Sequence, residues 1–327
     1  MDAKKPESSS LIDLPNELTA HFGATKEYPW NAEAVKGWLD KNRALLDESR
    51  AIALMPDRSS GGMSDDETRI HSGSAYSEFS KAFLMEARLF AEQGDVTRAL
   101  ESIRAAKGLA NHLRDGEAPT LMEGFRGGNI QRTIDRYVFS NILPVIPARQ
   151  VDVPAWENAV NPTLREPEDF TRMIRGEWNI YMPGTLLPAL ADSKDSSTPG
   201  DAEAMAEAYT RSFESLVTRN KSLTLADLPS NPIVHASYKD LSRRSQQIAK
   251  DHGMTSDSYN MRDIWQGTQV QTGMTRAAFA ILKGQPIPND PVHGLPYQWD
   301  PATRKLSLPD IPEYKKSGVR PMVLPKF

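Results

Sequence analysis

The sequence predicts an all-α fold: a helical-hairpin bundle followed by a proline-rich, mostly irregular C-terminal tail with room for one small β-hairpin. Three observations predict it. Apolar residues recur at intervals of three and four over several long segments, which is the spacing of one helix face. Gly94-Asp95 interrupts two such stripes, as a tight turn between antiparallel helices would. Nine of the 24 prolines lie in residues 284–327, where they exclude a long helix.

Composition narrows the class of function. The 327 residues are 39% hydrophobic and 25% charged, which is typical of a globular chain. A net charge of -4 leaves no basic excess to neutralise a phosphate backbone, so we expect no nucleic-acid partner. The lack of cysteine excludes disulfides, thiolate zinc sites and cysteine nucleophiles. Because no apolar run approaches the ~20 residues that span a bilayer, we expect no membrane span.

The chain divides into three parts by composition. Residues 1–10 are polar and predict a disordered lead, residues 11–283 a helical domain, and residues 284–327 an extended tail packed on the helical body. Residues 192–200 read Asp-Ser-Lys-Asp-Ser-Ser-Thr-Pro-Gly, which is typical of a linker. We interpret this linker as a division between two helical layers rather than between independent domains.

The N-terminal part predicts two helices and a loop. Residues 11–22 predict a short amphipathic helix with a proline near its start. A longer helix is expected over residues 31–54, because apolar residues recur there at helical spacing and Asn31 can cap the first turn. Pro56 ends this helix, and residues 57–74, rich in serine, glycine and aspartate, predict a polar exposed loop.

The segment Tyr76–Leu113 is the most regular in the chain. Two apolar stripes flank Gly94-Asp95, and small residues such as Ala87 and Ala99 would let two helices approach closely. The spacing resembles a tetratricopeptide unit, whose stacked copies form peptide-binding grooves. Such grooves need about three repeats, and no second copy occurs in the sequence. We therefore interpret the hairpin as the core of one helical domain.

Further helices are expected over residues 120–146, 168–181, 202–218, 238–252 and 259–282. The first of these contains Gly124, Gly127 and Gly128, which invite comparison with a phosphate-binding loop. No Gly-Lys-Ser or Gly-Lys-Thr follows them, and no hydrophobic strand precedes them. We therefore interpret the three glycines as close-packing or helix-breaking residues.

The C-terminal tail offers one element of regular structure and an excess of basic charge. Residues 295–308 predict a small β-hairpin with its turn at residues 300–304. Residues 302–327 hold six basic and two acidic residues. A basic tail can dock on an acidic surface, but ordinary solubility is the simpler interpretation at this density.

The sequence holds no compact catalytic or metal-binding motif. The six histidines are scattered, none lies three or four residues from another, and no Gly-x-Ser-x-Gly elbow occurs. We expect no catalytic residue, no metal and no cofactor. Glu86 and Glu177 lie in apolar helices. Arg88 lies on a different helix face from Glu86 and cannot pair with it, and Trp178 beside Glu177 could raise the pKa of that carboxyl by burial. For both glutamates, a solvated or capping carboxylate is the simpler interpretation.

Six tryptophans are many for a helical chain of this size. Three lie in apolar helical segments and are expected in the core: Trp38, Trp178 and Trp265. Three neighbour prolines in looser stretches and could line a ligand platform: Trp30, Trp156 and Trp299. Glu177, which precedes Trp178, is added to these three. The candidate ligand-binding residues are therefore Trp30, Trp156, Glu177 and Trp299.

Three segments in this order resemble a known group of proteins. The helix over residues 31–54 precedes a variable loop and then the Phe83–Leu113 hairpin. The last helix leads into Gly284-Gln-Pro and Leu295-Pro-Tyr-Gln-Trp-Asp-Pro. This layout is similar to uncharacterised helical envelope proteins of planctomycete- and verrucomicrobia-type bacteria, which end in an Asp-Pro-Phe-Thr/Ser-Gly-x-Pro-Leu-Arg-Tyr hairpin. Here residues 300–305 read Asp-Pro-Ala-Thr-Arg-Lys, without the phenylalanine, the glycine or the arginine-tyrosine ending.

The resemblance implies a helical domain on the outer side of the cytoplasmic membrane, with no assigned activity. We therefore expect a non-catalytic interaction or scaffold protein of the periplasm or cell envelope, with a protein or peptide partner. The alternative is a small-ligand binder or enzyme whose site is assembled between helices from distant carboxylates and tryptophans. A concave or apolar surface patch would favour the first hypothesis, and a pocket that joins Glu177 to tryptophans would favour the second.

Overall fold

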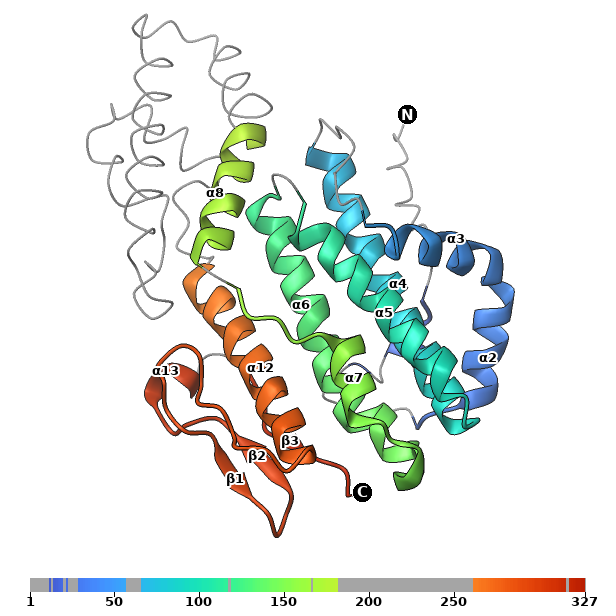
Figure 1. Cartoon of the computed structure of the whole chain (residues 1–327). Helices are drawn as coiled ribbons and strands as arrows, with labels where there is room; N and C mark the ends of the chain where they lie inside the picture. The colour runs from blue at the N-terminus through green and yellow to red at the C-terminus, as the bar shows by residue number, and fades with distance from the viewer. Residues whose placement is uncertain are drawn as a thin grey trace, which may run out of the picture.

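In the computed structural model, the described part of the chain is a mostly helical body with a small antiparallel sheet beside it (Figure 1). The described residues are 12, 14–19, 22, 29–56, 66–116, 119–165, 167–181, 261–315 and 318–326. The mostly helical class is confirmed. None of the helices in these ranges combines the length and apolar character needed to cross a membrane. Four predicted segments lie outside the described residues: 1–10, 192–200, 202–218 and 238–252.

The described elements are mostly helices, with short strands near the C-terminus. They are α1 (Asn16–Thr19), α2 (Ala32–Lys41), α3 (Arg43–Ala53), α4 (Asp66–Glu92), α5 (Val96–Arg114), α6 (Leu121–Tyr137), α7 (Val153–Val160), α8 (Pro167–Tyr181), α12 (Met261–Leu282), β1 (Gln298–Asp300), β2 (Lys305–Ser307), α13 (Pro312–Lys315) and β3 (Met322–Val323). A π turn (Val138–Ile142) and a 3-10 turn (Leu143–Val145) continue α6, and another 3-10 turn (Ala148–Gln150) precedes α7. The helices α4, α5, α6 and α12 pack in that order, each against the next (Figure 1).

The predicted turn at Gly94-Asp95 joins α4 to α5. Gly94 has a φ of +77°, a left-handed conformation that glycine adopts without strain. The Asp95 carboxylate caps α5 by accepting a hydrogen bond from the Arg98 amide at 3.1 Å. The helix before the turn begins at Asp66, so the predicted loop is wrong for residues 66–74. Polar residues disfavour a helix by only about 0.5 kcal/mol each, and the packed remainder of α4 outweighs that preference.

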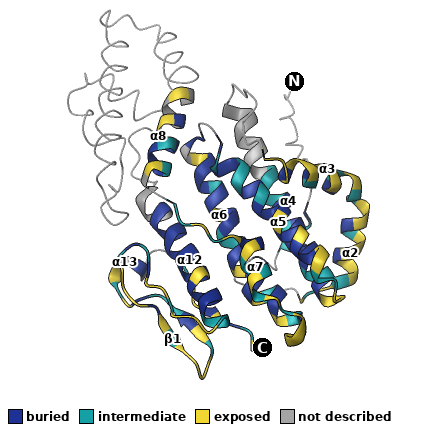
Figure 2. Cartoon of the chain, viewed as in Figure 1, coloured by how far each residue is buried: buried dark blue, intermediate teal, exposed yellow. Residues whose placement is uncertain are grey.

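The α4–α5 hairpin lies in the core of the body. The helix α5 packs against α3, α4, α6 and α7. Phe83 of α4 and Ile103 and Leu109 of α5 have no exposed surface. Figure 2 shows buried residues along α5, α6 and α12, whereas much of α2 and α3 is exposed. The hairpin is therefore packed against other helices of the described body.

The N-terminal helices differ in detail from the prediction. Of the helix expected over residues 11–22, the structure describes the single turn α1. Asn31 caps α2 as predicted, since its Oδ1 accepts a hydrogen bond from the Ala34 amide at 3.0 Å. The single helix expected over residues 31–54 is divided at Asn42, whose Nδ2 donates to the Trp38 carbonyl at 2.8 Å. An asparagine side chain that bonds to the backbone competes with the helix, which explains the break.

The three glycines of α6 are close-packing residues. A methyl group on Gly124 would lie 1.8 Å from Met173 Sδ, and one on Gly127 would lie 2.6 Å from the Ala110 carbonyl oxygen. A methyl group on Gly128 would lie 3.1 Å from an atom of α12. The absence of side chains on this part of α6 therefore lets α5, α8 and α12 approach it.

The C-terminal tail packs on the helical body through a small sheet. The predicted hairpin in residues 295–308 is present as antiparallel β1 and β2, with Trp299 opposite Leu306. The prediction of one hairpin misses a third strand, because β3 pairs with the other edge of β2. Leu306, Met322 and Leu324 belong to the same buried cluster as the helices. No local pattern marks a two-residue strand, and β3 forms where the burial of Met322 and Leu324 brings the chain beside β2.

Candidate functional site

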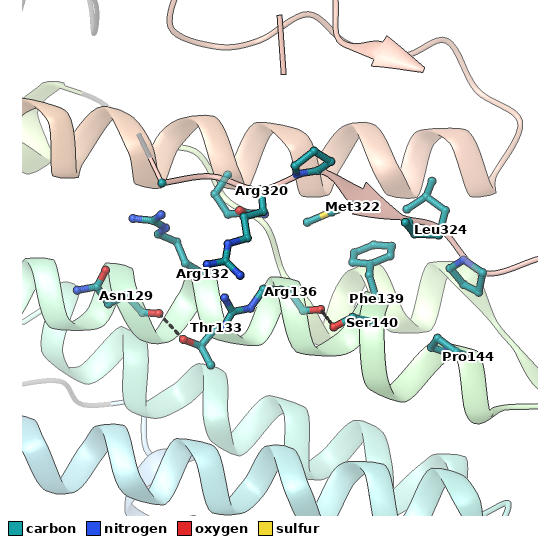
Figure 3. Close-up of a pocket in the computed structure, with 15 residues that line it drawn as sticks. Asn129, Arg132, Thr133, Arg136, Phe139, Ser140, Pro144, Arg320, Met322 and Leu324 are labelled. Atoms are coloured by element: carbon teal, nitrogen blue, oxygen red, sulfur yellow. Dashed lines mark hydrogen bonds between the residues drawn. The ribbon is translucent and has the colours of Figure 1, made fainter. Parts of the chain in front are cut away.

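A groove runs along α6 and the π turn, and the C-terminal segment 318–325 forms its other wall (Figure 3). Its cavity has a volume of about 720 Å³, which lies within the range of small-molecule sites. We call it the arginine groove, after Arg132, Arg136 and Arg320, which line it.

The helix periodicity of α6 and the course of the tail bring the three arginines together. Arg132 and Arg136 are four residues apart, so their side chains lie on one face of α6. Arg320 comes from the segment that leads into β3, and Figure 3 shows it reaching toward the other two from the opposite wall. The Arg136 Nη2 donates to the Phe22 carbonyl at 2.6 Å, which ties this part of α6 to the N-terminal segment.

The arginines of the groove affect each other's electrostatics. Burial and the neighbouring Arg136 charge lower the pKa of Arg132, and Asp135 partly opposes them. Burial and the Arg320 charge lower the pKa of Arg136. Arginine remains protonated at neutral pH despite such shifts. Arg136 therefore lies near enough to both Arg132 and Arg320 for their like charges to disfavour one another.

The described lining of the arginine groove contains no carboxylate. This is unexpected for a chain with a net charge of -4. Asp135 lies between Arg132 and Arg136 in the sequence but has no exposed surface, and its carboxylate is turned into the interior toward Gln131. The carboxylate that is nearest to Arg132 and Arg136 in the sequence is therefore turned away from the groove.

A buried amide also lines the arginine groove. Gln271 of α12 is 5% exposed, and its Nε2 has no hydrogen-bond partner in the described structure. Gly128 of α6 lies against Thr268 of α12, and Asp135 interacts with Thr275. Gln271 lies between these two contacts on α12, and Arg132 lies between them on α6. The two residues are therefore at a similar level along the paired helices. A buried donor without an acceptor costs about 1–3 kcal/mol, and a ligand oxygen would satisfy it.

The hydroxyl groups of the groove are engaged locally. Thr133 Oγ1 donates to the Asn129 carbonyl at 2.9 Å, and Ser140 Oγ donates to the Arg136 carbonyl at 2.7 Å. Both bonds run to the residue four positions earlier on the same helix. The groups that the groove offers to a ligand are consequently guanidinium and amide donors.

The structure places the predicted tryptophans on different elements. Trp30 donates from Nε1 to Glu92 Oε2 at 2.9 Å, beside the end of α4. Trp156 has no exposed surface on α7, so the prediction of a looser stretch around it is wrong. Trp299 lies on β1, where the Arg304 guanidinium stands 5.9 Å from its ring centroid. The described contacts do not bring these three side chains together into a platform.

Glu177, the fourth predicted site residue, has no described contact with Trp30, Trp156 or Trp299. Glu177 lies on α8, but its side chain and that of Trp178 lie outside what the structure describes. Its pairing with a tryptophan therefore remains a prediction. Of the tryptophans expected in the core, Trp265 is 3% exposed, and Trp38 is half-buried against the core cluster.

Glu86 is the clearest correction to the sequence analysis. Its carboxylate is 1% exposed rather than solvated. It accepts hydrogen bonds from Arg43 at 2.6 Å, from Arg50 at 2.5 Å and from the Ser102 hydroxyl at 2.7 Å. Burial alone would raise the pKa of Glu86, but the bonds from Arg50 and Arg43 outweigh burial and lower it. The partners come from α3 and α5, which helix spacing around Glu86 does not reveal.

Glu86 lies at the base of a second hollow, of about 470 Å³, which we call the Glu86 hollow. Its lining holds both signs of charge, with Asp40, Asp47 and Glu101 as well as Arg43 and Arg50. The buried carboxylate thus connects α3 to α4 and α5, and the surrounding charges are largely balanced within the protein.

A third polar cluster is buried between α5, α6 and α12. Lys107 donates to the Gln131 side chain and, at 2.9 Å, to the Asn161 carbonyl; Gln131 in turn donates to Asp135. Burial raises the pKa of Asp135 to about 6, although Lys107 and the Gln131 and Thr275 side chains act against it. Within the described ranges, no group of three or more histidine and carboxylate side chains could hold a metal ion.

The arginine groove and the Glu86 hollow define the candidate site on a mostly helical body with a small C-terminal sheet. Comparisons of the chain with protein-family models, with curated proteins and with solved structures found no match. The function is therefore inferred from the geometry of the site.

Proposed function

We propose that this protein is a non-catalytic binding protein that holds an anionic ligand in the arginine groove. One observation carries the proposal: Arg132, Arg136 and Arg320 converge from two walls of a cavity whose described lining has no carboxylate. Guanidinium groups form paired, charge-assisted hydrogen bonds with carboxylate and phosphate oxygens. An anion among the three side chains would relieve their mutual repulsion and satisfy the Gln271 amide.

The character of the lining groups favours binding over a reaction. Guanidinium and amide groups keep their protonation state at neutral pH, and the groove's two hydroxyl groups are bonded to their own helix. Such groups orient an acidic ligand without taking up its proton. This proposal keeps the non-catalytic character expected from the sequence. It replaces the tryptophan and glutamate site with arginines from α6 and from the segment before β3.

The location and the wider role are proposed on the resemblance of layout alone. We propose that the protein acts in the bacterial cell envelope, and that the anionic ligand is either a free molecule or an acidic group of a partner. Fractionation of cells that produce the full chain, followed by detection with an antibody, tests the location. Recovery in the cytoplasmic fraction alone would contradict it.

Calorimetric titration of the full chain with inorganic phosphate tests the binding proposal. We expect saturable binding that weakens as salt rises, because ionic contacts are screened. Arg132→Gln and Arg320→Gln should each weaken binding by about tenfold, the typical value of one charge-assisted hydrogen bond.

Arg149→Gln is the matched control, because Arg149 is an exposed arginine outside the groove. It should leave the phosphate affinity unchanged. Equal weakening by Arg149→Gln and Arg320→Gln would point to a general charge effect and would contradict a site in the groove. Binding that is insensitive to both groove variants would contradict it as well.

A further inference from the structure

The wall of the arginine groove that carries Arg320 is joined to the rest of the protein by a short strand. Figure 3 shows Arg320, Met322 and Leu324 along this wall. The strand β3 within it comprises two residues, and its pairing with β2 places Met322 opposite Leu306. Strands in globular proteins are usually about 3–10 residues long. Contacts beyond this pairing must therefore help to hold the wall in place.

Arg304 supplies three hydrogen bonds at the end of the wall. Its backbone carbonyl accepts from the Leu324 amide at 2.9 Å, and its Nε donates to the Leu324 carbonyl at 3.1 Å. Its Nη2 donates to the Pro325 carbonyl. Because proline has no N–H, Pro325 cannot donate to a strand ladder. One guanidinium therefore bonds two consecutive carbonyls at the point where the strand pairing ends.

The backbone of Arg304 indicates that its surroundings fix it. Its φ is +54°, in the left-handed region that glycine and asparagine favour. Among the described non-glycine residues, Asn161 is the other with a positive φ. This conformation costs an arginine free energy, and such residues persist where the surrounding structure determines their conformation. The bonds to Leu324 and Pro325 hold Arg304 in this way.

The placement of Arg320 depends on this wall. Arg320 is exposed and lies two residues before Met322, so its backbone position follows that of β3. Arg136 belongs to α6 and is tied to the Phe22 carbonyl. Met322 and Leu324, which are 6% and 2% exposed, also anchor the wall through their burial. The separation of Arg136 from Arg320 is therefore set by where the C-terminal segment is held.

We propose that Arg304 is a positioning residue of the arginine groove: its guanidinium holds residues 324 and 325 and thereby keeps Arg320 opposite Arg136. This inference rests on the proposed function and adds a residue that lies outside the described lining of the cavity. An anion bonded to both walls needs them at a fixed separation, because charge-assisted hydrogen bonds have donor–acceptor distances of about 2.7–2.9 Å. The two carbonyl bonds require the planar fork of arginine.

The position of the wall can be tested without a ligand. The chain has no cysteine, so Val323→Cys provides a single site for a nitroxide spin label, at a residue that is 63% exposed. Electron paramagnetic resonance should show that Arg304→Gln and Arg304→Lys each shorten the rotational correlation time of this label about twofold. A label at Glu48→Cys, on the exposed surface of α3, is the control and should keep its mobility in both variants.

Calorimetric titration of the unlabelled full chain with inorganic phosphate tests the link to the groove. Arg304→Gln should weaken phosphate binding by about fivefold. Arg304→Lys should weaken it as well, because lysine keeps the charge but lacks the fork that bonds two carbonyls. Added to Arg320→Gln, Arg304→Gln should cause no further loss, as expected where one residue acts through the other. Circular dichroism checks that each variant folds.

The outcomes separate this inference from the proposed function. Unchanged label mobility or unchanged phosphate affinity in both Arg304 variants would overturn the inference and leave the anion site standing. Full phosphate affinity in Arg304→Lys alone would show that the charge matters rather than the fork, and would overturn it too. So would an equal loss from Arg304→Gln with and without Arg320. Absence of phosphate binding by the wild type would overturn the proposed function, whereas the label would still report whether Arg304 holds the wall.

Discussion

The Glu86 hollow and the arginine groove both contain arginines that line a cavity, but their charges are compensated differently. In the hollow, Arg43 and Arg50 bond to a carboxylate that is 1% exposed. In the groove, Arg132, Arg136 and Arg320 line a cavity without an acidic side chain in its described lining. An arginine that is bonded to a buried carboxylate holds elements together, whereas arginines that converge on a cavity lined by no described carboxylate are suited to an external anion.

The first test of this comparison removes the charge in the Glu86 hollow. Glu86→Gln should lower the free energy of unfolding by about 2–3 kcal/mol, because it removes the acceptor shared by two arginines. The loss should stay below that of a fully buried pair, since Arg43 is 39% exposed and solvent screens it. Urea unfolding followed by circular dichroism measures the effect. A loss under about 0.5 kcal/mol would show that the bonds contribute little.

The stability that Glu86 and its arginine partners contribute depends on pH with a defined sign. The folded-state pKa of Glu86 is lower than its ordinary value of 4.5. Its contribution to stability is therefore present above that ordinary pKa and is lost as the pH falls through the lower, folded-state value. Glu86→Gln should show a smaller loss of stability than the wild type over this acidic range.

A second test concerns Asp135, the carboxylate that adjoins the groove in sequence but is turned inward. Its pKa is raised to about 6 in the folded state, from 3.8. The stability that its protonated form contributes is complete below pH 3.8 and is lost as the pH rises through about 6. Relative to Asp135→Asn, the wild type should therefore lose about 2–3 kcal/mol between pH 4 and pH 8.

Chemical unfolding at both pH values measures this difference. Glu48→Gln, at an exposed carboxylate that lines neither cavity, is the control. A wild-type protein that is more stable relative to Asp135→Asn at pH 8 than at pH 4 would mean that Lys107 stabilises the ionised carboxylate more than burial disfavours it.

A third test compares one arginine from each region. Arg50→Gln should lower the free energy of unfolding by about 1–2 kcal/mol, since it removes a charged bond to Glu86 and a contact with the Phe83 ring. Arg320→Gln should change it by no more than about 0.5 kcal/mol, because a surface charge that is repelled by its neighbours contributes little stability. Thermal and urea unfolding distinguish the two. Equal losses would remove the distinction between the regions.

The smallest expected effect is ligand-linked stabilisation. Phosphate should raise the unfolding temperature by about 1–2 °C over chloride at equal ionic strength, as a weak ligand of the folded state does. Arg320→Gln should abolish the difference, and Glu86→Gln should retain it if the phosphate binds in the groove. Loss of the difference in Glu86→Gln alone would place the anion in the hollow instead.

Elements specified by neighbouring residues were predictable from the sequence. The turn at Gly94-Asp95, the Asn31 cap and the β1–β2 turn all depend on contacts within a few residues. The close packing around Gly124 was one of two interpretations that the sequence left open. Apolar periodicity likewise identified most of α5 and α12 before their partners were known.

The candidate site was not predictable in the same way. The sequence signals for the groove were two arginines four residues apart on α6 and an excess of basic residues in the tail, and neither indicates where the two segments meet. Trp30, Trp156 and Trp299 were the candidates from the sequence because they neighbour prolines in stretches expected to be loose. Trp156 is instead buried in the core of the body.

Among the described residues, the amino-acid sequence determined most of the long helices, the turn at Gly94-Asp95 and the apolar faces, because those properties arise from interactions within one or two turns of the chain. Tertiary structure alone decided that Glu86 is buried and paired with two arginines of α3. It also decided that β3 closes the sheet and that Arg320 faces Arg132 and Arg136. Charges far apart in sequence acquire their neighbours and their dielectric surroundings only when the helices pack.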